Sequence, residues 1–213
     1  MTPLRAAVRG AIAGALGTAA MDALWYCRYR RGGGKSRFAD WETSAGLEGW
    51  EDAPAPAKFG RLVVQRTLRR DLPPQCARLV NNAVHWSTGV GWGAVFGMVE
   101  GTIVRGRAWH GVPFGAAVWL QSYAVLAPLK LYKPIWEYDA ATLGRDLSAH
   151  VVYGTTTAAS INWLFRSRDS RTAKPPLLGR LGSMLDGEPW RHLSAAAPAA
   201  LLRRTSGRPG CRR

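Results

Sequence analysis

One histidine and four glycines recur at intervals of four residues between positions 85 and 101: His85, Gly89, Gly93, Gly97 and Gly101. Residues four apart lie on one face of an α-helix, and the positions between them are mainly valine, tryptophan, phenylalanine, alanine and methionine. In water such a helix would combine poor helix propensity with an apolar surface on every side. In a lipid bilayer the backbone closes its own hydrogen bonds, and small residues let a second helix approach closely. The spacing therefore predicts a transmembrane helix in a polytopic membrane protein.

The distribution of basic residues predicts how many such helices there are. The 213 residues include 29 lysines and arginines against 14 acidic residues, a net charge of +15. None of the basic residues lies in four windows: 10–27, 82–104, 108–129 and 147–165. Each window is close to the ~20 residues that cross a hydrocarbon core. We therefore predict an all-α, four-transmembrane-helix bundle over residues 1–165, with helices at about 8–27, 82–104, 108–129 and 147–165.

The segments outside these windows carry most of the charge. In the loop 28–81, a basic start is followed by an acidic and aromatic piece, then by an extended proline linker at 53–57 and an amphipathic basic helix at 58–70. We expect that helix to lie on the bilayer surface, near anionic head groups. The tail 166–213 is basic and rich in proline and serine, so we predict that it is disordered.

Several motifs are incomplete. Gly34-Lys-Ser lacks the earlier glycine of a phosphate loop, because position 29 is tyrosine. The spacing of Cys27, Cys76 and Cys211 is not that of metal ligands. A disulfide between Cys27 and Cys76 is compatible with the sequence. The sequence holds no nucleophile elbow, zinc-protease motif or dinucleotide fingerprint. We expect neither enzymatic activity nor a cofactor.

The two halves of the predicted bundle resemble each other. The first and third helices open with Gly-x-x-x-Gly-Ala, and the second and fourth open with His-x-x-x-Gly. A tandem pair of helical hairpins explains this pattern and places both histidines at the same membrane face. We expect the glycines to pack helix on helix, with those of the second helix facing the first or the fourth. The packing glycines are Gly10, Gly14, Gly17, Gly89, Gly93, Gly97, Gly101, Gly111, Gly115 and Gly154.

Five ionisable residues would then gather at one face: Asp22, His85, His150, Glu137 and Asp139. Ionisable groups at membrane depth are functional candidates. A histidine beside a carboxylate can relay protons or bind a divalent metal ion. In the alternative, each histidine only bridges helices through a hydrogen bond.

Three runs carry a family resemblance: Val80-Asn-Asn-Ala-Val-His85-Trp, Tyr132-Lys-Pro-Ile-Trp-Glu-Tyr-Asp139 and Asp146-Leu-Ser-Ala-His150. Over residues 8–165 the chain resembles small uncharacterised bacterial integral membrane proteins, many actinobacterial and distantly YagU-like. The resemblance implies a multi-pass protein of the cytoplasmic membrane, with a loose link to acid tolerance, and it supplies no catalytic residues.

The functional expectation is a small ion or proton pathway, or a membrane-homeostasis protein, with both termini in the cytoplasm. Its expected partners are the lipid bilayer, anionic lipid head groups and further copies of the chain. One alternative is a membrane adaptor that recruits a partner through the basic loop and tail. Another is a soluble basic protein that binds nucleic acid, with an affinity that falls steeply with salt. The four windows without basic residues argue against it, so we do not expect nucleic acid as a partner.

Overall fold

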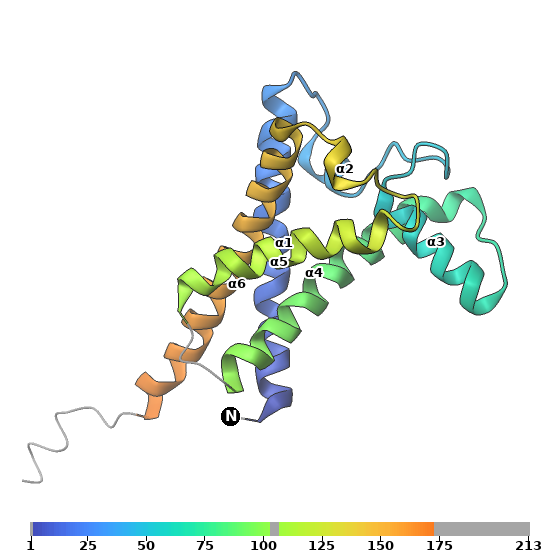
Figure 1. Cartoon of the computed structure of the whole chain (residues 1–213). Coiled ribbons are helices and arrows are strands. Elements are labelled where there is room, and N and C mark those ends of the chain that lie inside the picture. Colours follow the sequence, from blue (N-terminus) through green and yellow to red (C-terminus); the bar gives the residue numbers. More distant parts are fainter. Residues whose placement is uncertain (1, 103–106, 173–213) are drawn as a thin grey trace, which may run out of the picture. The chain divides into compact units, whose positions relative to one another are not determined.

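A computed structural model describes residues 2–102 and 107–172 of the chain (Figure 1). Every regular element in these ranges is helical, which confirms the all-α prediction. The α-helices are α1 (Pro3–Arg31), α2 (Phe38–Glu42), α3 (Ala55–Leu68), α4 (Ala77–Thr102), α5 (Gly111–Leu126) and α6 (Ala140–Thr172). Short 3-10 turns are η1 (Pro74–Cys76), η2 (Ala108–His110) and η3 (Ile135–Glu137).

One long helix lies at each of the four predicted windows, although α5 is shorter than the predicted 108–129, because residues 108–110 form η2 and the helix ends at Leu126. Helices α1 and α6 continue beyond their windows, and α1 ends in a turn that contains Arg28, Arg30 and Arg31. Cations at a helix C-terminus are favourable, because they face the negative end of the helix dipole. Helix α5 ends two residues before Pro128, which cannot continue it.

Within the described residues, no helix combines the length and the apolar character needed to cross a membrane.

The chain divides into two units after Arg168. Of the predicted disordered tail, residues 166–172 belong to α6. The remainder of that tail lies outside the described residues.

Helices α1 and α4 pack backbone against backbone through glycines. A Cβ atom on Gly93 would lie 2.5 Å from the Cα atom of Gly14, and one on Gly97 would lie 2.6 Å from that of Gly10. Because the contacts advance along α1 as they recede along α4, the two helices are antiparallel. We call this contact the first glycine seam.

Helices α5 and α6 repeat this arrangement. A Cβ atom on Gly111 would lie 2.5 Å from the Cα atom of Thr155, and one on Gly154 would lie 2.8 Å from that of Gly115. This second glycine seam is also antiparallel. The two halves of the chain therefore form similar helix pairs.

The two pairs are joined by aromatic and hydroxyl contacts. Phe96 of α4 stacks on Phe114 of α5, with ring centroids 4.1 Å apart. Tyr153 of α6 is 2% exposed, and its hydroxyl donates to the carbonyl oxygen of Gly89 at 2.7 Å. Gly17 of α1 lies against Tyr153 and Thr157. Helix α6 therefore contacts α1, α4 and α5.

The loop between α1 and α4 is ordered and covers one end of this bundle. Arg78 donates to the carbonyl and hydroxyl oxygens of Thr43, each at 2.8 Å, and Asn82 donates to the same carbonyl. These bonds hold the segment after α2 against the first turns of α4. Upstream, Tyr26 and Trp41 belong to an aromatic cluster with Tyr29 and Phe38.

The prediction of an extended linker in this loop was wrong, and the possible Cys27–Cys76 bridge is absent. Residues 53–57 are not an extended linker, because Pro54 caps α3 and Pro56 fits its first turn. Helix α3 packs on α4, where a Cβ atom on Gly60 would lie 2.7 Å from Val84. Ala57 and Gly60 of α3 are buried in this contact, whereas Val63 and Leu68 remain 42% and 65% exposed. Cys27 and Cys76 are free thiols and do not form a bridge.

Candidate functional site

A hydrogen-bonded acid–histidine pair lies at one end of the first glycine seam. Asp22 extends the buried face of α1 that contains Gly14 and Thr18, and His85 lies one turn before Gly89 on α4. The Nε2 atom of His85 lies 3.0 Å from each carboxylate oxygen of Asp22, whose residue is 5% exposed. Because a carboxylate only accepts, Nε2 carries the hydrogen in this pair.

Glu42 adds a second carboxylate to this pair. It is the last residue of α2, and its Oε1 atom accepts a hydrogen bond from Nε1 of Trp86 at 3.1 Å. Burial raises the pKa of the Glu42 carboxyl, and the nearby Asp22 charge raises it further. The sequence analysis did not select Glu42, because nothing local indicates that the segment folds back toward His85.

A second acid–histidine pair lies at the equivalent end of the second seam. The Nδ1 atom of His150 lies 3.0 Å from the main-chain oxygen of Asp146 and 3.4 Å from its Oδ1 atom. From α5, Trp119 Nε1 and Tyr123 OH donate to Asp146 Oδ2 at 3.1 and 2.9 Å. Asp146 is therefore a member of the site that the sequence analysis left out. Its position four residues before His150, on the same helix face, could have identified it from the sequence.

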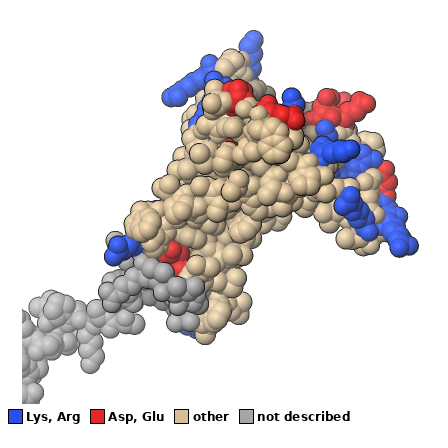
Figure 2. Space-filling view, in the orientation of Figure 1, with Lys and Arg blue, Asp and Glu red and all other residues tan. Residues whose placement is uncertain are grey.

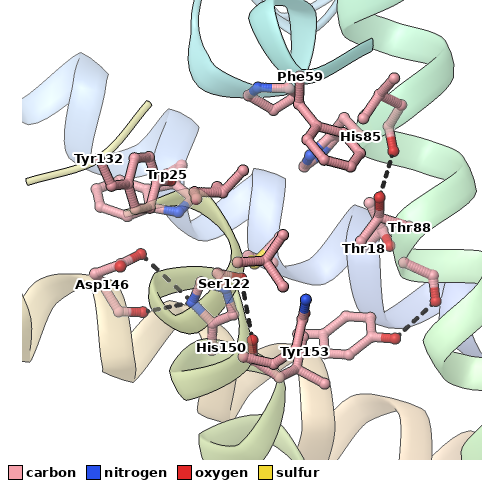
Figure 3. Close-up of a pocket in the computed structure, with 18 residues that line it drawn as sticks. Thr18, Trp25, Phe59, His85, Thr88, Ser122, Tyr132, Asp146, His150 and Tyr153 are labelled. Atoms are coloured by element: carbon pink, nitrogen blue, oxygen red, sulfur yellow. Dashed lines mark hydrogen bonds and ion pairs between the residues drawn. The ribbon is translucent and has the colours of Figure 1, made fainter. Parts of the chain in front are cut away.

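Both histidines line one cavity of about 380 Å³ between the helices (Figure 3). Its wall is mostly apolar, and α1, α3, α4, α5 and α6 all contribute to it. His85 and His150 reach it from α4 and α6, and Asp146 lies beside His150 in the same wall. One cavity is therefore lined by both histidines and by Asp146, and Asp22 lies behind His85.

Aromatic residues from several parts of the chain line this cavity. Trp25, Phe59 and Tyr132 line it, as Figure 3 shows. Burial, with further contributions from Asp146 and Tyr138, raises the pKa of Tyr132 to about 12. Its hydroxyl is therefore neutral at physiological pH. A neighbouring pocket of about 370 Å³ shares Trp25, Tyr132 and Asp146 with the main cavity.

Glu137 and Asp139 lie elsewhere. Both are exposed, and neither lines the cavity. Asp139 caps α6 by accepting hydrogen bonds from the backbone N–H and the hydroxyl of Thr142, at 2.9 and 2.6 Å. These bonds lower the pKa of its carboxyl. Of the five residues selected from sequence, the structure brings Asp22, His85 and His150 to the cavity region and leaves two outside it.

A third acid–histidine pair is separate from the site. Glu100 Oε1 lies 2.5 Å from His110 Nδ1, and Glu100 is 7% exposed. His110 does not line the main cavity.

The packing glycines behave as a set with one exception. The predicted glycines of α1, α4 up to Gly97, α5 and α6 all lie in close helix–helix contacts, either in the two seams or, for Gly17, against α6. Gly101 adjoins the undescribed residues 103–106.

The site has no cluster suited to a metal ion. Among the residues that the structure describes, no three His, Cys, Asp or Glu side chains are grouped so that they could hold one. Two-residue acid–histidine pairs instead suit proton exchange.

Scans against protein families, curated proteins and solved structures found no match to this chain.

Proposed function

We propose that this chain is a small multi-pass membrane protein whose cavity takes up and releases protons as part of a proton or ion pathway. The observation that carries the proposal is the pair of acid–histidine contacts on one cavity. Histidine is the side chain whose ordinary pKa lies nearest neutrality, so each pair can exchange a proton in the physiological range. The charged groups nearest these histidines are Asp22 and Glu42 for His85, and Asp146 for His150.

The outward faces of the helices support a lipid environment. On α1, four large apolar side chains recur every four residues on a face away from the glycine seam, and they are 47–74% exposed: Leu4, Val8, Ile12 and Leu16. Helices α4 and α5 expose further apolar residues, among them Val99 and Leu120. Soluble monomers rarely leave such continuous apolar surface in contact with water.

The distribution of charge supports the same environment. In Figure 2 the charged side chains gather toward the ends of the described part, and the surface between them is free of visible charge. The mean hydropathy of the long helices is lowered by their glycine and threonine residues. Those small residues lie mainly in the seams, where close packing rather than hydropathy stabilises the contact.

A proton-flux measurement in proteoliposomes tests the proposal. With a trapped pH-sensitive dye and an imposed pH gradient, the full chain should conduct protons faster than empty liposomes do. His85→Gln and His150→Gln should each reduce the rate at least about tenfold, because glutamine keeps an N–H donor but does not titrate. His110→Gln is the matched control, since His110 lies outside the cavity.

Two results would contradict the proposal. One is a wild-type rate equal to that of empty liposomes. The other is an unchanged rate in the His85→Gln/His150→Gln double variant. Circular dichroism and thermal unfolding of each variant establish that the comparison is made between folded proteins.

A further inference from the structure

The walls of the main cavity combine apolar and aromatic surface in a way that suits an organic molecule. Met21, Val118 and Leu126 contribute apolar side chains, and Trp25 and Phe59 contribute aromatic rings. Its volume of about 380 Å³ falls in the range of ~300–1,000 Å³ that is typical of small-molecule sites. The negative face of an aromatic ring attracts a cation that approaches within ~6 Å of its centroid.

Four of the hydroxyl groups that line the cavity already donate to main-chain oxygens, and the Gln121 amide and the Tyr132 hydroxyl are the other neutral donors in the lining. The hydroxyls of Thr18, Thr88 and Ser122 donate to carbonyl oxygens of their own helices, at 3.0, 2.7 and 3.0 Å. Tyr153 donates to the carbonyl of Gly89. These four hydroxyl protons are therefore already used.

The histidine tautomers likewise leave acceptors rather than donors facing a ligand. His150 Nδ1 faces a carbonyl oxygen, and His85 Nε2 faces a carboxylate, so each of these atoms carries the ring hydrogen. In the neutral rings, His150 Nε2 and His85 Nδ1 are then lone-pair acceptors. The carboxylate of Asp146 adds acceptor capacity to the same wall.

The charged carboxylate that lines the cavity is acidic, whereas the nearest arginines lie outside its lining: Arg28 stacks over the ring of Trp25, 4.9 Å from the ring centroid, and Arg145 lines the neighbouring pocket. Although the whole chain has a net charge of +15, no lysine or arginine is among the described residues that line this cavity. Asp146 lines it directly, and Asp22 and Glu42 lie behind His85. An anionic ligand would meet carboxylates here with no cationic side chain in the lining, whereas a cation would find acceptors.

We propose that the cavity binds a small organic cation, a protonated amine with an apolar or aromatic body. The ammonium group would donate hydrogen bonds to Asp146 and to the free nitrogen of His150, and the body would lie against Trp25 and Phe59. This inference deepens the proposed function, because it names the ligand class of the same site, and it rests on that function.

Three ligands of similar size and different charge test this assignment: 2-phenylethylammonium, 2-phenylethanol and phenylacetate. Each is titrated by calorimetry into the purified full chain in detergent near neutral pH. We expect the ammonium ligand to bind at least about tenfold more tightly than the alcohol, because it makes charge-assisted hydrogen bonds. Phenylacetate should not bind measurably.

Variants locate the site. Asp146→Asn should weaken ammonium binding by about tenfold or more, since it removes the charge but keeps an acceptor for Trp119 and Tyr123. Glu137→Gln, an exposed acid outside the cavity, is the matched control and should leave the affinity within about twofold. Thr88→Phe tests the location independently. It fills the cavity from an exposed helix position without removing any charge, and it should abolish binding.

Several outcomes would overturn the assignment. They are equal binding of the alcohol and the ammonium ligand, tighter binding of phenylacetate, and ammonium binding that persists in Thr88→Phe. Binding in detergent does not depend on flux. If the ammonium ligand binds but protons are not conducted, the ligand assignment stands and the proton pathway is wrong. If protons are conducted but the ammonium ligand does not bind, the proton pathway stands and the ligand assignment is wrong.

Discussion

At the scale of single residues, the site depends on how buried carboxylates are partnered. Asp22 is nearly inaccessible, and His85 satisfies both of its oxygens. Removing one partner of a buried pair is costly, because an unpaired carboxylate loses its hydration without compensation. Substitutions that keep a hydrogen-bond donor therefore separate the protonation role of His85 from its structural role.

Glu42 should make the stability of the protein depend on pH. Its pKa is raised in the folded state by burial and by Asp22, so folding favours the protonated carboxyl. The free energy of unfolding should therefore fall as the pH rises from the ordinary glutamate pKa of ~4.3 through the higher folded value. Glu42→Gln removes this ionisation and can still accept from Trp86.

We expect Glu42→Gln to flatten this part of the pH profile in chemical unfolding. At neutral pH it should be as stable as the wild type, or more stable by up to about 1 kcal/mol, because solvent screens the partly exposed carboxylate. Glu48→Gln, at an exposed position in the same loop, is the control. Parallel profiles for wild type and Glu42→Gln would show that Glu42 does not carry the effect.

At the scale of helices, the glycine seams set how closely the elements approach. On α4, Gly93 lies against the backbone of α1, whereas Gly91 on the same helix has open space beside it. The two positions share one helix and one residue type. Substituting Gly91 therefore changes helix propensity alone, whereas substituting Gly93 also changes the close contact with α1.

Gly93→Ala should destabilise the bundle by about 1–3 kcal/mol, because its Cβ atom would meet α1 backbone that cannot move independently. Gly91→Ala should be neutral or stabilising by up to about 1 kcal/mol, since alanine is the better helix former. Unfolding of both variants in the same detergent measures the difference. Equal stabilities would mean that the first seam is not a close contact in solution.

At the scale of the whole molecule, the structure has two kinds of surface. The loop over one end is held by arginine and asparagine hydrogen bonds, while the sides of the long helices expose apolar side chains. The first kind suits water and anionic head groups. Under the proposed function, the second would contact lipid.

A lysine placed on the apolar side of α1 should distinguish lipid from water as its surroundings. Ile12→Lys replaces a side chain that is 50% exposed. In a bilayer it should cost about 2–3 kcal/mol near the centre of a helix and reduce the amount recovered from membranes. In water an exposed substitution usually changes stability by less than about 0.5 kcal/mol.

Thr67→Lys, at an exposed position on α3, is the matched control and should be tolerated in both environments. Recovery from an alkaline-washed membrane fraction and thermal unfolding provide the two measurements. Unchanged recovery of Ile12→Lys, together with wild-type protein found mainly in the supernatant, would contradict a membrane location.

The sequence by itself determined the four long helices and the small-residue faces of the seams, because four-residue spacing is a local property of a helix. It also selected His85 and His150 from their place at the ends of those faces. Tertiary structure alone decided their partners. Asp22 meets His85 across an antiparallel contact, Glu42 arrives from a folded-back loop, and α5 positions Asp146.

Glu137 and Asp139 show the limit of the sequence in the other direction. Their proximity to α6 along the chain suggested membership of the cluster, yet the turn before α6 directs Asp139 to a cap and leaves Glu137 exposed. Spacing within a helix fixes which residues share a face. Which faces then enclose a common cavity depends on contacts between segments far apart in the chain, and no local pattern encodes those distances.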